Sequence, residues 1–335
     1  MTKGGSSNEL LLITTRHVAL PTDNRDVMFE HEDESEPHSN ILLLGDEAYD
    51  DCLASIQGAI EAREMKAERW ELHLKMAEGR GDKVADAECK AAERKIEAAK
   101  EAKEELCTFY NDVGKHWATS ASRVLGHVIY SPPMRLGAGI ADEGYTEDYA
   151  IVKVDTDKID RTQFKGNMID LGTDSTIGVW EFTKKMRSND DTPSFEYPFD
   201  RLLTLQGTIS DEEMRQQTPV DKDKKSCLMV IKDGSATGVT IGRASGIMSF
   251  VRDDSDGSCG ISKEWAILPY DAESGAFSAK GDSGAVIVDG LGRIGGLLTG
   301  GAGDKTQVDI TYATPISFIE KSIKTRYPNA HFNLA

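Results

Sequence analysis

One serine and several glycines near the C-terminal end of the sequence fit two competing kinds of chemistry. Ser283 lies within the run Gly281–Gly284, which reads GDSG and is typical of the setting of a serine nucleophile. Directly afterwards, the strand-like run AVIVD is followed by GLGRIG, which has the GxGxxG spacing of a dinucleotide-binding turn. Only the run AVIVD separates the two patterns, and we treat them as exclusive.

The dinucleotide pattern requires a helix that opens at its last glycine and binds phosphate at its N-terminus. The segment from Gly295 to Gly303 contains five glycines, which disfavour a helix. Asp289-Gly290 is instead a good hairpin turn between two strands. We therefore predict a hairpin here and no bound nucleotide or other organic cofactor.

A serine nucleophile needs a base to accept its proton and a carboxylate to orient that base. His17 is the strongest candidate base because it follows the strand-like run LLLIT, where a strand ends and a loop begins. The remaining histidines lie in an acidic loop, a helical stretch, a strand-like run and the tail: His31, His38, His73, His116, His127 and His331.

Asp148 is the candidate carboxylate. It opens the strand-like run DYAIVKVD, so the strand can anchor it while its side chain turns toward a histidine. Asp142, Asp155 and Asp157 lie in turn-like surroundings, where a solvated carboxylate is the simpler interpretation.

The order His17, Asp148, Ser283, with the runs TTRH, DYAIVKVD and GDSGAVIV, resembles the chymotrypsin-like (trypsin-fold) serine peptidases. The runs TRHV, GHVIYSPP, TGVTIGR and GAFSAKGDSGAVIVDGLGRIGGLLTGG resemble in particular an intracellular branch of trypsin-like proteins found in fungi. The resemblance covers residues 8–21 and about 122–325.

This resemblance implies a serine-type endopeptidase that forms an acyl-enzyme. Ser283 would attack the scissile carbonyl, His17 would act as general base and then acid, and Asp148 would hold the histidine tautomer. The backbone amides of Gly281 and Ser283 would form the oxyanion hole.

The resemblance also implies substrate-binding positions. Thr299, Gly300 and Gly301 would pair with a substrate strand, and Phe277 would lie at the bottom of the specificity pocket. Without an acid at Phe277, we expect no preference for Arg or Lys. No liberated N-terminus is evident to pair with Asp282, so the chain would fold directly into its active form or be switched by a partner.

The chain that must position these residues is predicted to have three parts. Residues 46–118 lack proline, are rich in Ala, Glu and Lys, and repeat apolar residues at helical spacing, which predicts an antiparallel coiled-coil hairpin. It would be inserted in a first β-barrel formed by residues 1–45 and 119–165. Residues 166–335 would form a second barrel with a C-terminal helix.

The rest of the chain from Ser122 is predicted to be all-β, as a trypsin-like double barrel. Only ISFIEKSIKTRY shows helical spacing there, and TIGVWEFT is assigned to a strand. Only 16 residues precede His17, so we expect that the first barrel lacks an N-terminal strand.

The composition of the chain argues against two kinds of partner, nucleic acid and the membrane. The net charge of −18 argues against nucleic acid, and no apolar run reaches the roughly 18 residues of a membrane span. The five cysteines show neither disulfide nor zinc spacing, and no signal peptide is evident, so an intracellular location is expected. The acidic run HEDESEPH, from His31 to His38, is interpreted as solvated, and no metal is expected.

Two further functions stay open beside the endopeptidase. The protein could be a catalytically inactive scaffold with a protease fold that binds partners, or a second copy of itself, through residues 46–118. It could also be an esterase-like hydrolase with the same triad. A protein or peptide substrate is expected for the main hypothesis.

Overall fold

A computed structural model of the chain describes residues 2–4, 9–31, 35, 37–80, 82–140, 143–172, 177–187, 195–216, 227–253, 260–303 and 308–333. The chain divides into two compact units, one of residues 1–39 and 126–335 and the other of residues 40–125. The finer division at residue 165 that we predicted stays a prediction.

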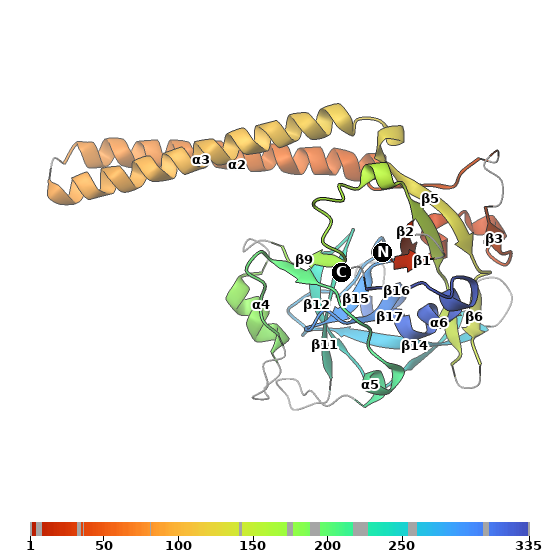
Figure 1. Cartoon of the computed structure of the whole chain (residues 1–335). Helices are drawn as coiled ribbons and strands as arrows, with labels where there is room; N and C mark the ends of the chain where they lie inside the picture. The colour runs from red at the N-terminus through yellow and green to blue at the C-terminus, as the bar shows by residue number, and fades with distance from the viewer. Residues whose placement is uncertain are drawn as a thin grey trace. The chain divides into compact units, whose positions relative to one another are not determined.

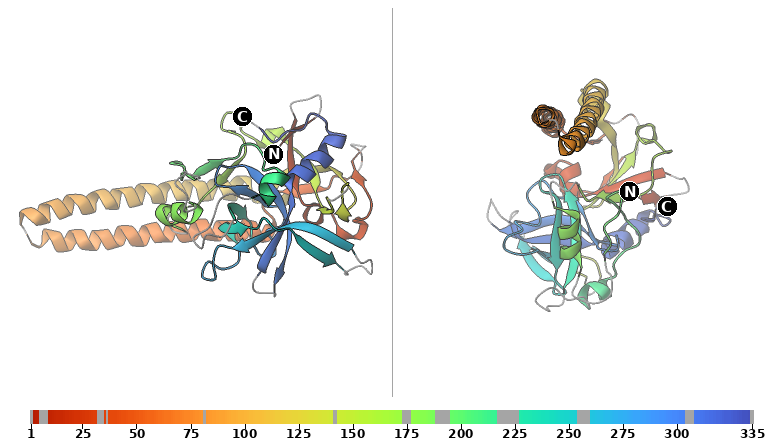
Figure 2. Two further views of the ribbon diagram at one scale, coloured as in Figure 1. Left: turned by 90° about the horizontal axis from the view of Figure 1, so that it is seen from below. Right: turned by 90° about the vertical axis from the view of Figure 1, so that its left-hand side faces the viewer.

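The smaller unit contains the predicted helical hairpin, α2 (Asp46–Glu78) and α3 (Lys83–His116), which run side by side in opposite directions (Figures 1 and 2). Asp82 begins α3 by accepting a hydrogen bond from the amide of Ala85 at 2.7 Å. Small side chains let the helices approach closely, and five alanines are buried along them: Ala67, Ala77, Ala85, Ala92 and Ala99. The helical periodicity was therefore a sound guide to this element.

The two ends of the hairpin are joined by one arginine. Arg123 ends the short 3₁₀ helix η2 (Ser120–Arg123) and is buried. Its guanidinium donates to the carbonyl oxygens of Leu44 and Trp117 at 2.9 and 2.8 Å and pairs with Asp46. One side chain thus holds the residues that enter and leave the hairpin.

The first sheet of the larger unit follows the order β1-β2-β8-β5-β3, and β4 (Asn40–Leu42) pairs with β5. Its five other strands are all paired antiparallel: β1 (Thr2–Gly4), β2 (Glu9–Thr14), β3 (Phe29–Glu30), β5 (Val124–Ser131) and β8 (Ala150–Val154). Two strands therefore precede His17.

The second sheet contains a closed barrel. The order β12-β11-β15-β16-β17-β14 returns to its start because β14 also pairs with β12, and every pair in the ring is antiparallel. The ring strands are β11 (Leu228–Gly234), β12 (Gly238–Ala244), β14 (Gly260–Pro269), β15 (Val286–Asp289), β16 (Ile294–Gly303) and β17 (Val308–Pro315).

The remaining strands lie beside these sheets or pair with each other: β6 (Arg135–Ala138), β7 (Tyr145–Glu147), β9 (Met168–Asp170), β10 (Leu202–Thr204) and β13 (Ser249–Asp253). The helices of this unit are α1 (Arg16–Ala19), α4 (Val179–Met186), α5 (Asp211–Arg215) and the predicted C-terminal α6 (Ile316–Arg326). The all-β fold class with an inserted helical hairpin and a C-terminal helix is confirmed.

One strand prediction is wrong. The run TIGVWEFT contributes to helix α4, where Phe182 and Met186 are buried one turn apart while Trp180 is exposed. The apolar residues lie on one helical face, and the β-branched residues at the start of the run suggested a strand.

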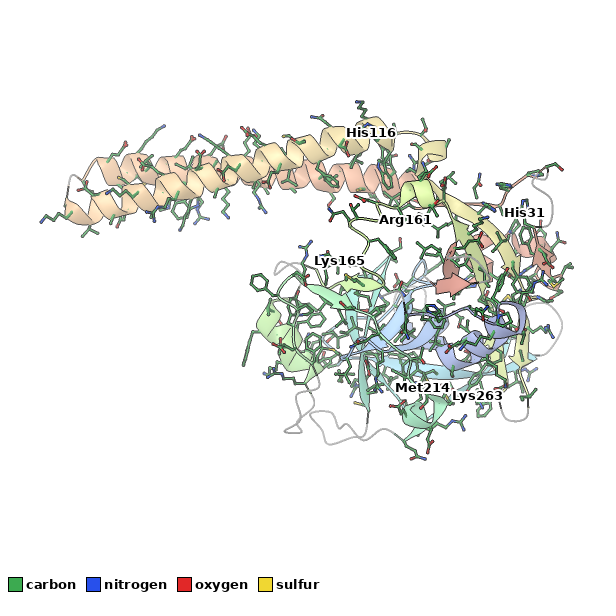
Figure 3. All side chains as sticks on the ribbon, in the orientation of Figure 1. His31, His116, Arg161, Lys165, Met214 and Lys263 are labelled. Carbon is green, nitrogen blue, oxygen red and sulfur yellow. The ribbon has the colours of Figure 1, made fainter. Side chains whose placement is uncertain are left out.

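The barrel core explains why glycines recur in β16. Trp265 of β14 is fully buried, and a side chain at Gly295 would meet its indole ring at 2.6 Å. Met214 of α5 belongs to the same buried cluster and is labelled in Figure 3. The glycines therefore make room for core packing.

The GxGxxG run is a hairpin, as predicted. Asp289 ends β15 and accepts hydrogen bonds from the amides of Leu291 and Arg293, after which β16 begins at Ile294. Gly292 has φ +76°, a conformation that favours glycine. A strand follows where a nucleotide-binding turn would need a helix, so the dinucleotide interpretation fails.

No helix in the described part of the chain is both long and apolar enough to cross a membrane. Four of the cysteines, Cys52, Cys89, Cys107 and Cys227, are free thiols. Cys259 and Asp142 lie outside the described residues.

Candidate active site

The register of the first sheet brings His17 and Asp148 together. Thr14 at the end of β2 lies opposite Ala150 at the start of β8. His17 follows the first of these positions by three residues and Asp148 precedes the second by two, so both extend from the same end of the strand pair.

Asp148 binds His17 through both carboxylate oxygens. Oδ2 lies 2.5 Å from the ring Nδ1, and Oδ1 accepts the backbone amide of His17 at 3.1 Å. The Asp148 side chain is 1 % exposed and that of His17 is 30 % exposed. Because an ionised carboxylate can only accept hydrogen bonds, Nδ1 carries the proton and Nε2 is left able to accept one.

The hydrogen bond to Asp148 raises the pKa of His17 above its ordinary value of 6.5, although burial of the ring opposes this effect. A carboxylate partner stabilises the imidazolium, which is the species that forms when the ring takes a proton. The pair thus has the electrostatics of an oriented general base.

Ser131 connects the neighbours of this pair. Arg16, which is buried, donates to the Ser131 hydroxyl at 2.8 Å, and that hydroxyl donates to the carbonyl of Tyr149 at 2.7 Å. Arg16 and Tyr149 adjoin His17 and Asp148 in the chain, so this link fixes the backbone on both sides of the pair. Sequence reasoning missed Arg16 and Ser131, although the TRHV and SPP runs contain them.

The turn that carries Ser283 packs against the same end of β2. Gly284 has φ +90°, and a side chain there would collide with Thr14 and lie 3.5 Å from the amide nitrogen of Thr15. The half-buried Ser283 is therefore held beside the strand end from which His17 extends.

The backbone around Ser283 leaves two amides unused. The amides of Asp282 and Gly284 donate to the carbonyls of Ala279 and Leu298. Within the described residues, the amides of Gly281 and Ser283 donate to no acceptor. Gly281 has φ +108°, a conformation that glycine readily adopts.

Asp282 is buried and has an internal counterion. Its oxygens accept hydrogen bonds from the amides of Ala236, Thr237 and Ala279, at 2.8, 3.2 and 2.9 Å, and from the Thr237 hydroxyl at 2.7 Å. The ammonium of Lys232, whose side chain is wholly buried, lies 3.5 Å from Oδ2. Sequence reasoning did not identify Lys232.

These contacts set the ionisation of the pair. Burial alone would raise the pKa of Asp282, but the hydrogen bonds and the attraction of Lys232 lower it below its ordinary value. Burial lowers the pKa of Lys232, and the nearby carboxylate offsets part of that effect. The ion pair therefore holds the turn between Gly281 and Gly284 from within the chain.

Strand β16 has an open edge next to this turn. Its pairing with β15 ends at Leu297, and Leu298 exchanges backbone hydrogen bonds with the residues beside Ser283. From Gly300 onward β16 pairs only with β17 among the described residues. A side chain at Gly300 would meet nothing within 4 Å, so space is free there.

The other predicted substrate residues differ in exposure. Thr299 and Gly300 are half-buried, and Gly301 is exposed. Phe277 is 1 % exposed and packs in the core cluster of Trp265. Its predicted place in a specificity pocket stays a prediction.

No known family model matches the chain, and no curated protein matches it in sequence. Solved structures to which it is similar are chymotrypsin-like serine proteases. One is a glutamic acid-specific serine protease that uses a histidine triad in substrate binding, with 16 % identity, 62 % of this chain and 75 % of that chain covered, and a TM-score of 0.32.

Two others have the same TM-score of 0.32. The chymotrypsin of Cellulomonas bogoriensis is 16 % identical over 63 % of this chain and 76 % of its own. A homologue of alpha-lytic protease, N4, is 18 % identical over 62 % and 74 %.

A buried acid beneath the site gives a pH-dependent prediction for stability. Glu264 of β14 is 3 % exposed and is hydrogen-bonded to Thr146, two residues before Asp148. Burial raises the pKa of Glu264 from 4.5 to about 7, against hydrogen bonds that lower it. At a pH between these two pKa values, Glu264 is protonated in the folded state and ionised in the unfolded chain. Glu264 therefore makes folding less favourable as the pH rises.

We expect Glu264→Gln to remove this dependence. The unfolding free energy of the variant minus that of the wild type is expected to be up to about 3 kcal/mol larger at pH 8 than at pH 4.5. Urea unfolding of both proteins at several pH values from 4.5 to 8 measures the difference. A difference that stays constant over this range would contradict the prediction.

Proposed function

We propose that this protein is a serine endopeptidase of the trypsin-like class, with Ser283 as nucleophile, His17 as general base and Asp148 as the residue that orients His17. The observation that carries the proposal is the hydrogen bond of 2.5 Å between His17 Nδ1 and Asp148, at the strand end on which the Ser283 turn packs. This arrangement leaves Nε2 of His17 available as the base.

The first step is acylation. Ser283 Oγ attacks the scissile carbonyl carbon while His17 Nε2 takes the hydroxyl proton, and the carbonyl oxygen becomes an oxyanion. The unused amides of Gly281 and Ser283 receive this oxyanion. His17 then gives its proton to the leaving amine as the C–N bond breaks, and water releases the acyl group by the reverse sequence of proton transfers.

The open edge of β16 supports a peptide as the substrate. An extended chain can add to a free strand edge by backbone hydrogen bonds. Thr299, Gly300 and Gly301 lie at this edge, and the absence of a side chain at two of these positions gives a peptide backbone room to approach. We propose that the substrate is a protein or peptide whose residue before the cleaved bond is neither Arg nor Lys.

The finer assignments rest on the sequence resemblance. Membership of the fungal trypsin-like branch, an intracellular location and self-association through residues 46–118 stay predictions.

Labelling with a fluorophosphonate probe tests the proposal without a known substrate. Ser283 Oγ would displace fluoride from phosphorus while His17 accepts the proton, which leaves a stable phosphonyl ester. We expect labelling of the full-length protein, its complete loss in Ser283→Ala, and no change in Ser274→Ala, which removes an exposed serine hydroxyl.

A folded wild-type protein that refuses the probe would overturn the enzyme proposal and favour the scaffold hypothesis. If labelling occurs, a panel of matched peptide and ester substrates separates an endopeptidase from an esterase. Cleavage of esters alone would contradict the proposed reaction.

A further inference from the structure

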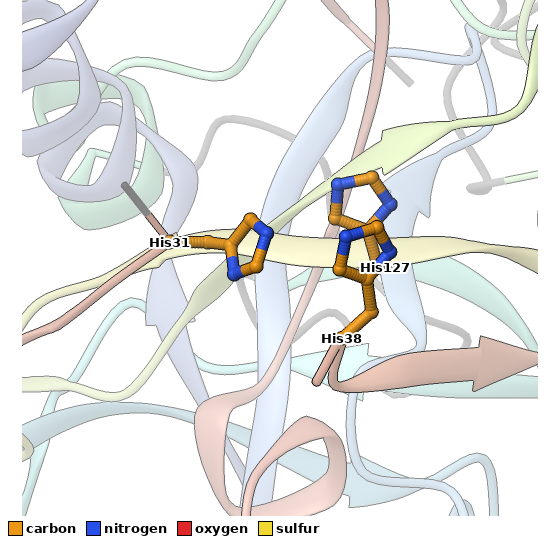
Figure 4. Close-up of side chains that lie close together, drawn as sticks. All are labelled: His31, His38 and His127. Carbon is orange, nitrogen blue, oxygen red and sulfur yellow. The ribbon is translucent and has the colours of Figure 1, made fainter. Parts of the chain in front are cut away.

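Three histidines outside the proposed active site gather on the first sheet (Figure 4). The ring centroids of His38 and His127 lie 4.2 Å apart, those of His31 and His38 4.6 Å, and those of His31 and His127 5.5 Å. One nitrogen from each ring lies within 4.8 Å of the other two. Imidazole nitrogen is a preferred ligand of zinc and its neighbours among the transition metals.

Backbone pairing enforces this gathering. His127 lies in β5, and His31 directly follows β3, whose Glu30 pairs with Tyr130 of β5. The amide of His31 donates to the carbonyl of Ile129 at 3.1 Å. The first histidine is thereby anchored beside the strand that carries the second.

The third histidine is anchored from the other side. Val128 of β5 donates its amide to the carbonyl of Ser39 at 2.9 Å, and Ser39 directly follows His38. Both ends of the segment from His31 to His38 are thus bonded to β5 within two residues of His127. The site consists of fixed backbone positions and does not depend on the placement of the acidic residues between them.

One ring nitrogen of the cluster is buried without a hydrogen bond in the described part of the chain. Nε2 of His31 is buried and has no hydrogen-bond partner among the described residues. A buried polar nitrogen without a partner is costly, and a ligand that accepts its lone pair removes this cost. Burial, together with repulsion from His38 and His31, lowers the pKa of His127.

Two charged side chains among the described residues act on His127. Lys153 of β8 lies opposite it in the strand pairing, and Lys153 lowers the pKa of His127 while Asp155 raises it. His38 is exposed, so water can reach the cluster from that side.

We propose that His31, His38 and His127 bind one Zn²⁺ ion, with water at the fourth position. This site is separate from the proposed function, and it revises the expectation from sequence that no metal is bound. Nitrogens that share a zinc ion lie about 3.4 Å apart, so ligand nitrogens that now lie within 4.8 Å of one another need to approach by at most about 1.4 Å.

Zinc would tie both ends of the segment from His31 to His38 to β5 through side chains in addition to the backbone. Since an ion that binds only the folded state stabilises it by mass action, the melting temperature is expected to rise with zinc concentration. β5 also carries Ser131, which fixes the neighbours of His17 and Asp148. The metal would therefore reinforce a strand that supports the proposed active site.

Calorimetric titration of the untagged, full-length protein with ZnCl₂ tests the site. We expect one tight site, and we expect His38→Gln and His127→Gln each to weaken it by more than about 100-fold, because loss of outer-sphere partners alone costs 10- to 100-fold. His116→Gln is the matched control, since it removes an exposed histidine of α3. Titration with Mg²⁺, which prefers oxygen ligands, is expected to show no binding at this site.

A second readout identifies the ligands without relying on affinity. Co²⁺ bound by three imidazoles and water in tetrahedral geometry absorbs visible light strongly, and this absorption should disappear in His38→Gln. That variant changes an exposed side chain and is expected to keep its fold, which circular dichroism checks. Zinc binding that survives in both histidine variants would assign the ion to the acidic residues or the cysteines and would overturn the proposal, as would the absence of tight zinc binding in the wild type.

Discussion

His17→Ala is expected to reduce the rate of fluorophosphonate reaction at Ser283 by about 10⁶-fold, because loss of the base in such triads costs about this much. The serine hydroxyl would keep its proton and attack only as a weak nucleophile. The rate is measured under pseudo-first-order conditions with excess probe. Val18→Ala, an exposed neighbour in α1, is the control and should react at the wild-type rate.

The companion variant Asp148→Asn should cost about 10⁴-fold, since an amide can no longer hold the ring in the productive tautomer. In the wild type, reactivity should rise with pH through a His17 pKa that lies above 6.5, because only the neutral ring accepts a proton. Without the Asp148 carboxylate, this rise in reactivity should occur at lower pH. A His17→Ala protein that reacts within tenfold of the wild type would remove His17 from the mechanism.

Lys232→Met is expected to lower both stability and reactivity. It leaves Asp282 as a buried charge without its counterion, and breaking a buried pair in this way costs about 3–5 kcal/mol. The turn between Gly281 and Gly284 would loosen, and the loss of one oxyanion donor alone costs about 10²–10³-fold in rate. Urea unfolding and the rate of fluorophosphonate labelling measure the two effects.

Two further variants distinguish the role of Lys232 as the counterion of Asp282 from the effect of simply removing a positive charge. Lys184→Met removes an exposed lysine of α4 and should change neither quantity. Adding Asp282→Asn to Lys232→Met should recover part of the stability, because the uncompensated charge is gone. Equal unfolding free energies for Lys232→Met and the wild type would show that the pair has no such role.

The features of this protein that could be predicted from the sequence are those with local signals. The helices α2 and α3 repeat apolar residues over more than thirty positions each, and Ser283 lies in a short glycine turn. His17 and Asp148 were found because each adjoins a strand, and the register of β2 with β8 brings them together. Their catalytic roles stay a proposal.

The features that were missed depend on pairing between distant segments. Lys232 ends the apolar run LMVI of β11, where a lysine side chain would ordinarily reach solvent, and it is instead buried beside Asp282, fifty positions later. His127 meets His31 through the register of β3 with β5 and His38 through the hydrogen bond from Val128 to Ser39. The second barrel was expected from the family resemblance, because its closure depends on the pairing of β12 with β14, which no local pattern reports.

The position of Arg123 at the base of the helical hairpin affects how the length of the hairpin can evolve. Arg123 binds the carbonyls of Leu44 and Trp117, so the hairpin departs and returns at one point. In the sequence, α2 and α3 together amount to a single insertion between Leu44 and Trp117. Whole turns added to both helices, or removed from both, would leave that junction intact. The hairpin length is thus free to vary while the proposed catalytic residues stay under separate selection.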